Sequence, residues 1–515
     1  MADIRGETMI NPLLSDDPNT IAGSLKQAIK LDKESSAKKY AREGIRYYDH
    51  ENDILNNRIF YIDDEDVLRE DKYASNTKIP HGFFPEIVDQ KTQVLLSNPL
   101  TFECDDETLK EELKSYYNED FQVFLQDVVT SASQKGYEYI FARTTVADRL
   151  TFQIADSLTV FPVYDDTNEL RRIVRNIDKE IVKNGKKVTI HLTEVWDDKQ
   201  VWFFKAEGTE NYKLNADIQL NPRPHVIAVT DEGDMLARDY GTIPFYRYKN
   251  NAKETTDLKP IKALIDDYDI MNAFLSNNLQ DFTEAIYVVK GYDGDDLSKL
   301  RQNIRAKKTV GVDNDGGVEI KTVNIPVEGR KTKMEIDKEN IYKFGMAFDS
   351  TQIGDGNITN IVIKSRYSLL IMKVNKTEVR IRALLKWINE MVIADINRRT
   401  NKVYDPASVT FEFTRELMVN ETDLVTNDKT VAETKQIIIQ TVLEAAPQLP
   451  SDEVLRIICD QFELDFEEIK ELLEEEPYSK GISTGTDGEV VENAATGQVE
   501  SGIESSNQKE VQPNQ

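Results

Sequence analysis

Residues 257–282 read DLKPIKALIDDYDIMNAFLSNNLQDF and predict a long amphipathic helix. Asp257 is a suitable N-cap, and Pro260 is tolerated in the first turn of a helix. The apolar side chains follow a repeat of about 3.5 residues that Asn272 interrupts. They are Leu258, Ile261, Ile265, Tyr268, Leu275, Leu279 and Phe282. The opposite faces of this helix carry the carboxylates of Asp266, Asp267, Asp269 and Asp281.

The chain that follows predicts a small β unit and a second helix. Residues 286–289 (IYVV) have the composition of a strand, and the NDGG sequence at 314–317 is a strong hairpin turn. A strand over 318–325 follows this turn, and a helical pattern returns over 328–348. We therefore expect two helices with a β hairpin unit between their ends.

Residues 349–360 (DSTQIGDGNITN) form a polar break before another long helix, which is expected over 361–398. At a dozen residues, the break is longer than most helix–helix connections. It is either an ordinary connection or a mobile element that faces a ligand. The residue pattern alone does not choose between these two interpretations.

The region upstream changes its hydrophobic period along the chain. Helical spacing over 20–43, 80–96 and 106–135 gives way, from Tyr137 to about Tyr248, to short strands separated by Asp, Asn and Gly turns. This pattern indicates an α+β block and not a βαβ ladder.

The C-terminal part is predicted to be mostly helical. A strand over 409–413 precedes helices over 428–446 and 451–475. The sequence after Pro477 has almost no large apolar residues and is expected to be disordered. The chain as a whole is therefore predicted to be α+β and mainly helical.

Composition narrows the class of protein. The chain has 515 residues and a net charge of −28, so a protein whose whole surface grips nucleic acid is disfavoured because phosphates would be repelled. Its two cysteines, Cys104 and Cys459, are too few for a disulfide framework or a cysteine zinc site. There is no signal-peptide pattern and no apolar run long enough to span a bilayer. We expect a soluble protein of a reducing compartment.

The charge is unevenly distributed along the chain. Residues 451–515 hold 17 acidic and 4 basic side chains, whereas residues 360–402 hold 10 basic and 3 acidic ones. The basic side chains of the helix over 361–398 do not share one face. Pairing with the acidic excess of neighbouring elements is the favoured interpretation, and a positive belt beside a polyanion is the alternative.

Searches for catalytic motifs give no support to an enzyme. The sequence has no P-loop, no HExxH and neither a GxSxG nor a GxGxxG motif. Asp266, Asp267 and Asp269 could bind magnesium, but neighbouring residues on a helix point in different directions, so a solvated acidic face is the better interpretation. A second acidic group resembles a calcium loop but lacks its register, and turn chemistry explains it better. Its members are Asp293, Asp295, Asp296, Asp313 and Asp315. We predict no catalytic residue, metal or cofactor.

The order of these parts resembles the portal proteins of tailed double-stranded DNA bacteriophages, in the branch found among long-tailed phages of Gram-positive hosts. Local strings over residues 40–430 agree with this resemblance in sequence order. They include GIRYYDHENDI at 44–54, VDQKTQ at 88–93, IPF at 243–245 with KNN at 249–251, LIDDYD at 264–269, YVVKGYDG at 287–294 and FTR at 413–415.

The resemblance implies a subunit with wing, stem, clip and crown regions, assembled into a ring with a central channel. It implies the following division: 1–60, N-terminal helical region; 61–256, α+β wing; 257–284, stem helix; 285–327, clip; 328–348, second stem helix; 349–360, tunnel loop; 361–427, long basic helix and returning wing strand; 428–476, helical crown; 477–515, disordered acidic tail.

The resemblance also suggests roles for individual residues. Short neutral side chains of the tunnel loop are expected to touch DNA: Ser350, Thr351, Gln352 and Asn357. The acidic stem residues Asp266, Asp267, Asp269 and Asp281 are expected to line the channel and repel phosphates within a Debye length, about 8–10 Å. The clip docking surface is expected to comprise Tyr292, Asp293, Asp295, Asp296, Asp313, Asn314 and Asp315.

The implied function is a channel at one capsid vertex for packaging and ejecting the genome. The implied partners are further copies in a dodecameric ring, double-stranded DNA bound without sequence preference, the terminase large subunit, a head-completion adaptor, and scaffold and major capsid proteins, but no membrane. The implied location is the virion, after assembly in the host cytoplasm. The alternatives are a capsid or scaffold protein without a channel and a magnesium-dependent enzyme.

Overall fold

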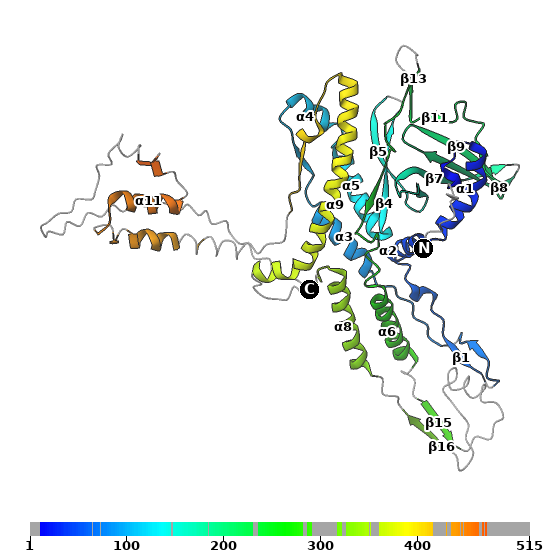
Figure 1. The fold of residues 1–515 in the computed structure, drawn as a ribbon. Coiled ribbons are helices and arrows are strands. Elements are labelled where there is room, and N and C mark those ends of the chain that lie inside the picture. The colour runs from blue at the N-terminus through cyan, green and yellow to red at the C-terminus, as the bar shows by residue number, and fades with distance from the viewer. Residues whose placement is uncertain are drawn as a thin grey trace, which may run out of the picture. The chain divides into compact units, whose positions relative to one another are not determined.

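The computed structural model describes residues 11–470 with gaps at 64, 73, 146–147, 184, 230–234, 282–285, 291–316, 322–325, 350, 352–359, 416–428, 430–433, 443, 446–447, 463–465 and 468. The chain divides into two compact units, residues 1–423 and 424–515. The first unit combines helices with antiparallel sheets, in agreement with the predicted α+β class (Figure 1).

Two predicted helices are each divided by a capping residue. The pattern over 20–43 forms α1 (Pro18–Lys33) and α2 (Ser36–Tyr48), because the Ser35 hydroxyl accepts the Lys38 N–H and starts a new helix. The pattern over 106–135 forms α4 (Glu107–Lys114) and α5 (Glu119–Lys135), with Asn118 as the second cap. The prediction of single helices was wrong in both places, since apolar spacing alone does not register a cap.

The largest sheet has the strand order β10-β9-β8-β7-β6, with β11 pairing β9. Its strands are β6 (Val160–Tyr164), β7 (Leu170–Lys183), β8 (Lys186–Trp196), β9 (Gln200–Glu207), β10 (Lys213–Leu214) and β11 (Arg223–Pro224). Helix α1 covers one face, where Ile21 and Leu25 pack with Trp202. This packing fixes the N-terminal helices on the sheet.

A second sheet of order β14-β4-β5 joins the first to the helices. Its strands are β4 (Tyr137–Thr144), β5 (Leu150–Ala155) and β14 (Phe245–Lys249). Helix α5 ends immediately before β4 at Gly136, which has a φ of +92°. A Cβ there would lie 2.4 Å from the carbonyl oxygen of Glu254, so this turn requires glycine.

Small two-stranded pairs complete the described strands. They are β1 (Phe60–Ile62) with β2 (Leu68–Glu70), β12 (Val226–Val229) with β13 (Met235–Arg238), β17 (Thr410–Glu412) with β3 (Thr101–Glu103), and β15 (Ile286–Lys290) with β16 (Gly317–Lys321). In the last pair, the predicted strand at 286–289 pairs with the start of the one predicted over 318–325. Short 3-10 turns are η1 (Pro12–Leu14), η2 (Asp53–Asn56) and η4 (Pro406–Ser408).

The main core forms around α9 (Asn360–Thr400), a helix without glycine or proline. Its buried stripe packs against α3 (Phe83–Leu95) and β14 and belongs to the same hydrophobic cluster as the buried side chains of α5. The stripe includes Leu370, Val374, Ile381, Leu384, Ile388 and Val392, all at most 1% exposed. This repeat of three to four residues buries one side of the helix predicted over 361–398.

Helices α6 (Lys262–Asp281) and α8 (Val327–Gly345) pack side by side and lead to β15 and β16 (Figure 1). Their upper ends join a core with α2 and α3 through Ile265 and Ile341, both 0% exposed. Helix α6 begins five residues after Asp257, so the prediction of this residue as its N-cap was wrong. The second unit contains α11 (Ser451–Phe462), within the helix predicted over 451–475.

Candidate functional site

The pair formed by α6 and α8 is held together by a charged contact. The ammonium of Lys333 on α8 donates to Asp267 on α6 at 2.5 Å and also bonds Asp337, one turn along α8. The hydrogen bond that Lys333 donates to Asp267 raises the pKa of Lys333, and Asp337 adds to the effect. The carboxylate of Asp267 is therefore paired across the contact between the two helices.

The other described aspartates of α6 face away from α8. The carboxylate of Asp266 accepts hydrogen bonds from Tyr47 and, at 2.7 Å, from Lys262. Asp269 is 1% exposed and accepts from the side chain of Asn52 at 2.7 Å and from the backbone N–H of His81 at 3.1 Å. The spacing i, i+4, i+7 places Lys262, Asp266 and Asp269 on one face.

The predicted channel lining is therefore wrong for Asp269. Its carboxylate is buried against the segment between α2 and α3, where it satisfies donors that would otherwise lack a partner. Asp266 and Asp267 are bonded to lysines, which neutralises much of their field. The side chain of Asp281 lies outside the described residues. The sequence placed these carboxylates on one helix but could not show which neighbours they would meet.

Helix α8 carries acidic side chains that the sequence interpretation missed. Glu328, Glu335 and Glu339 are exposed and, within the described part of the chain, have neither a hydrogen bond nor an ion pair. Their spacing of seven and four residues places them on one face, opposite the buried Asp337. We call these three residues the α8 glutamate stripe. The spacing of these three glutamates is the sequence signal that indicates this face.

The segment predicted as a tunnel loop is described only at its ends. Ser350, Gln352 and Asn357 lie outside the described residues. The Thr351 hydroxyl donates to Asp349 at 2.7 Å and accepts from Lys338 at 2.6 Å. Phe348 stacks on Tyr367 of α9 with ring centroids 4.2 Å apart. The segment is thus anchored at its start to α8 and α9.

A buried ionic cluster joins the entry to α6 and the C-terminal end of α8. Lys91 of α3 is 1% exposed and donates to Asp257 at 2.7 Å and to the side-chain oxygen of Asn250 at 2.8 Å. Lys373 of α9 lies 3.2 Å from the same carboxylate and donates to the Gly345 carbonyl at the end of α8. We call Lys91, Asn250, Asp257 and Lys373 the junction cluster.

The electrostatics of the junction cluster follow from its burial. Desolvation alone would raise the pKa of Asp257, but Lys373 and Lys91 outweigh it and hold that pKa well below its usual range. Desolvation lowers the pKa of Lys91 to about 8, against the attraction of Asp257. The cluster therefore places two ammonium groups beside one carboxylate, at the meeting point of α3, α8, α9 and the entry to α6.

The predicted docking residues of the β unit belong to the stretch of chain between β15 and β16. Strands β15 and β16 are paired from Ile286–Lys321 to Lys290–Gly317. The residues between these strands lie outside the described part. They include Tyr292, Asp293, Asp295, Asp296, Asp313, Asn314 and Asp315.

Several basic side chains of α9 find acidic partners, as the favoured interpretation predicted. Arg398 bonds Asp148, in the turn before β5, at 2.6 Å, whereas Arg382 pairs with Glu378 of α9 itself at 2.7 Å. Arg399 bonds Glu112 of α4 at 3.1 Å. The pairs of Arg398 and Arg399 fix α9 to its surroundings, and all three pairs leave less positive charge for a polyanion.

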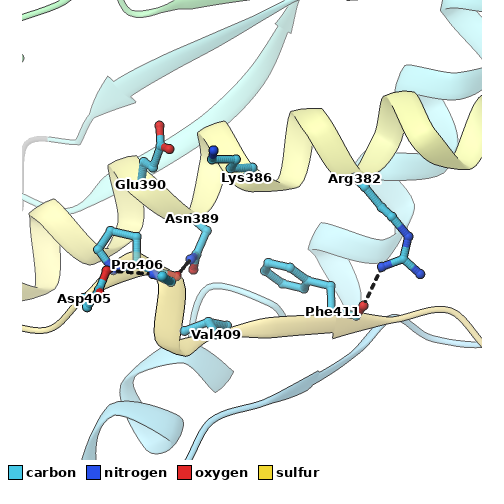
Figure 2. A pocket seen from close by; sticks show the side chains of 9 residues that line it. Arg382, Lys386, Asn389, Glu390, Asp405, Pro406, Val409 and Phe411 are labelled. Carbon is cyan, nitrogen blue, oxygen red and sulfur yellow. Dashed lines mark hydrogen bonds between the residues drawn. The ribbon is translucent and has the colours of Figure 1, made fainter.

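A cavity of about 430 Å³ lies between α9 and the segment that leads to β17 (Figure 2). Arg382 donates to the carbonyl of Phe411 at 2.9 Å, and Asn389 donates to the carbonyl of Pro406 at 2.8 Å. Two of its polar side chains thus hold the strand segment on the helix. The lining mixes Lys386 with Glu390 and Asp405, so its charges largely offset one another.

The described residues contain neither a metal-binding group nor a membrane-spanning helix. Within the described residues, no group of at least three His, Cys, Asp or Glu side chains could hold a metal ion. The described helices include none that is both long and apolar enough to cross a bilayer.

Comparison with known proteins gives a family. A model of the family described as phage portal protein, SPP1 Gp6-like, matches residues 27–481. The portal protein of Bacillus phage SPP1 is 31% identical over 391 residues, which cover 74% of this chain and 75% of the relative. The portal protein of Clostridium phage phiCD119 is 24% identical over 414 residues, 76% of this chain and 86% of that one.

Among solved structures, the chain matches the neck of a native GTA particle computed with C12 symmetry, at 11% identity and a TM-score of 0.32, over 74% of this chain and 90% of the other. The neck of an empty GTA particle computed with C6 symmetry matches with a TM-score of 0.35. These two scores are too low to carry an argument. From the family match and the 31% identity to the SPP1 relative, the chain belongs to the SPP1 Gp6-like family of phage portal proteins.

Proposed function

We propose that copies of this chain assemble into a ring at one vertex of a phage head, with a central channel through which double-stranded DNA is packaged and ejected. The observation that carries this proposal is the family match over residues 27–481. A closed ring needs a heterologous interface repeated by rotation, and it is dodecameric in the capsid under this proposal. The protein acts in the virion after assembly in the host cytoplasm.

The proposed regions map onto the described elements. The wing comprises residues 61–256 with the returning strand β17, and the stem comprises α6 and α8. The clip, residues 285–327, contains β15 and β16, and the crown, residues 428–476, contains α11. The clip docks the terminase large subunit during packaging and the head-completion adaptor afterwards. Scaffold and major capsid proteins meet the ring from the shell.

The channel needs a surface that does not hold DNA. Each phosphate that a lysine or arginine neutralises adds affinity for DNA through counterion release. Basic side chains that face the channel would therefore slow the movement of DNA. The α8 glutamate stripe is exposed and has no ion pair among the described residues, in contrast to Asp266, Asp267 and Asp269 of α6. We assign the repulsive lining of the stem to Glu328, Glu335 and Glu339. Contact with DNA belongs to the short neutral side chains of the tunnel loop, residues 349–360.

The chain hydrolyses nothing under this proposal, and a separate ATPase supplies the energy. The absence of a P-loop motif from the sequence supports this division of labour. Purified protein imaged by negative-stain electron microscopy is expected to show rings with an axial hole. Shells would favour a capsid or scaffold protein, and monomers at high concentration would contradict the portal ring.

The tunnel loop has a separate test. Deletion of residues 350–358 is expected to leave ring formation intact and to impair DNA packaging or retention, measured as the fraction of full heads. A deletion of similar size in the acidic tail, residues 500–508, serves as the control. Normal packaging and retention in the loop deletion would refute a role of the loop in handling DNA.

A further inference from the structure

A second cavity, of about 230 Å³, opens beside the junction cluster. It lies between the end of α3, the entry to α6, the C-terminal end of α8 and the middle of α9. Its lining residues are Lys91, Asn250, Asn251, Asp257, Pro260, Phe344, Gly345, Met346, Lys373, Lys376 and Thr377. Phe344 is 51% exposed and Lys376 is exposed, so solvent reaches the cavity from that side.

The charges around this cavity do not balance. Lys91 and Lys373 share the single carboxylate of Asp257, which leaves one positive charge in excess. Lys376 lies three residues after Lys373 on α9 and adds a second positive charge at the mouth of the cavity. It has no ion pair within the described residues. A buried excess of charge is costly unless a counter-charge enters. The lowered pKa of Lys91, about 8, reflects its burial and the nearby Lys373.

Hydrogen-bond donors also remain available. An ammonium group has three donors. Lys91 uses one on Asp257 and one on Asn250, and Lys373 uses one on the Gly345 carbonyl and contacts Asp257 at 3.2 Å. Each therefore keeps a donor that the described protein groups do not take. Asn250 supplies no spare donor, because its amide is bound to Thr255 and Asp257.

We propose that this cavity binds a phosphate-type oxyanion between Lys91, Lys373 and Lys376. A tetrahedral anion has oxygens in several directions and can accept hydrogen bonds from several ammonium groups at once. It also supplies negative charge, which a water molecule does not. The cavity is far larger than the roughly 10–15 Å³ needed for one water. The proposal rests on the geometry of one subunit and does not depend on the channel function. The phosphate group comes either from a free anion or from a DNA backbone.

The test uses the full-length purified protein and inorganic phosphate at constant ionic strength, with chloride as the reference anion. Isothermal titration calorimetry is expected to show saturable phosphate binding to the wild type. Lys376→Gln should weaken this binding about tenfold, because one charge-assisted hydrogen bond is lost. The matched control is Lys331→Gln, which removes an exposed lysine of α8 outside the cavity. No phosphate-specific heat in the wild type, or equal weakening by both variants, would overturn the proposal.

A second arm distinguishes the two sources of phosphate. A short DNA duplex is added while the phosphorus-31 NMR line of bound inorganic phosphate is followed. Displacement of phosphate in the wild type, reduced in Lys376→Gln but not in Lys331→Gln, identifies a DNA backbone. Retention of bound phosphate identifies a free anion as the ligand. Phosphate is also expected to raise the melting temperature of the wild type and of Lys331→Gln. Loss of this rise in both variants would contradict the site.

Discussion

The two helices α6 and α8 both carry a series of acidic residues, but the contacts of the two series differ. The aspartates of α6 are bonded to neighbours: Asp269 is buried against Asn52 and His81, and Asp267 joins Lys333. The α8 glutamate stripe is exposed and free of described partners. Acidity in the sequence is therefore not the same as charge that is available to a ligand.

The physical reason is the direction of each helix face. On α6, the face with Asp266 and Asp269 meets the segment between α2 and α3, and the next face meets α8. Burial of a carboxylate is tolerated only where donors satisfy it, so these contacts are structural. On α8, the glutamates lie opposite the face that packs on α6. The comparison predicts that α6 variants change stability and that α8 variants change behaviour toward DNA.

The largest effect is expected for Asp269→Ala. The change leaves the Asn52 amide and the His81 backbone N–H without their buried acceptor, which should cost about 3 kcal/mol or more of folding stability. Thermal unfolding measures the loss, and Glu335→Ala is the exposed control. Equal melting temperatures for the two variants would contradict the division between the helices.

An intermediate, pH-dependent effect is expected for Asp53, which bonds Lys262 at the start of α6. Desolvation opposes ionisation of Asp53, but hydrogen bonds from Lys262 and Arg46 outweigh it and lower its pKa to about 2. A lowered pKa stabilises the folded state above the unfolded value of about 3.9, and the gain is lost as pH falls toward 2.

Asp53→Asn should therefore be less stable than the wild type at pH 5 to 7. The difference in melting temperature should close as pH falls from about 4 to about 2. Because Asp53 is substantially exposed, the difference should be small. The control Glu335→Gln should show no such convergence, and a difference for Asp53→Asn that stays constant down to pH 2 would argue against the ion pair.

The smallest effect on stability, within about 0.5 kcal/mol, is expected for the double change Glu335→Lys with Glu339→Lys, since both side chains are exposed. Its effect on DNA should be large by comparison. Rings of this variant should bind duplex DNA, with a salt slope that steepens by about 0.9 per phosphate neutralised.

Filter binding of duplex DNA over a range of salt concentrations measures this change. The matched control is Glu107→Lys with Glu111→Lys on α4, which reverses the same number of exposed charges four residues apart. If both double variants bind DNA equally, the glutamate stripe has no special position in the channel.

Much of the fold was predictable from periodicity. The long helix α9, the helix α8 and the strands of the α+β block occur where the apolar pattern placed them. The breaks at Ser35 and Asn118 were missed, because a capping side chain competes with helix continuation at a single residue. The start of α6 was placed too early, because Asp257 looks like a cap but serves as the partner of two lysines.

The candidate site was less predictable than the fold. Asp266, Asp267 and Asp269 were identified as acidic, but their partners come from residues up to 219 positions away in the chain. The junction cluster likewise joins Lys91, Asp257 and Lys373, and no local pattern connects them. Pairing between residues so far apart depends on how the helices pack, and the spacing of residues along the sequence does not show this.

The sequence by itself determined the order of helices and strands, the net charge of −28 and, through its strings of residues, the portal family. These properties are local or additive, so they can be derived without coordinates. Only the tertiary structure decided which carboxylates are exposed without an ion pair among the described residues, which are paired with lysines, and where an excess of positive charge is enclosed. Ionisation and exposure depend on neighbours in space, and packing brings those neighbours together from distant parts of the chain.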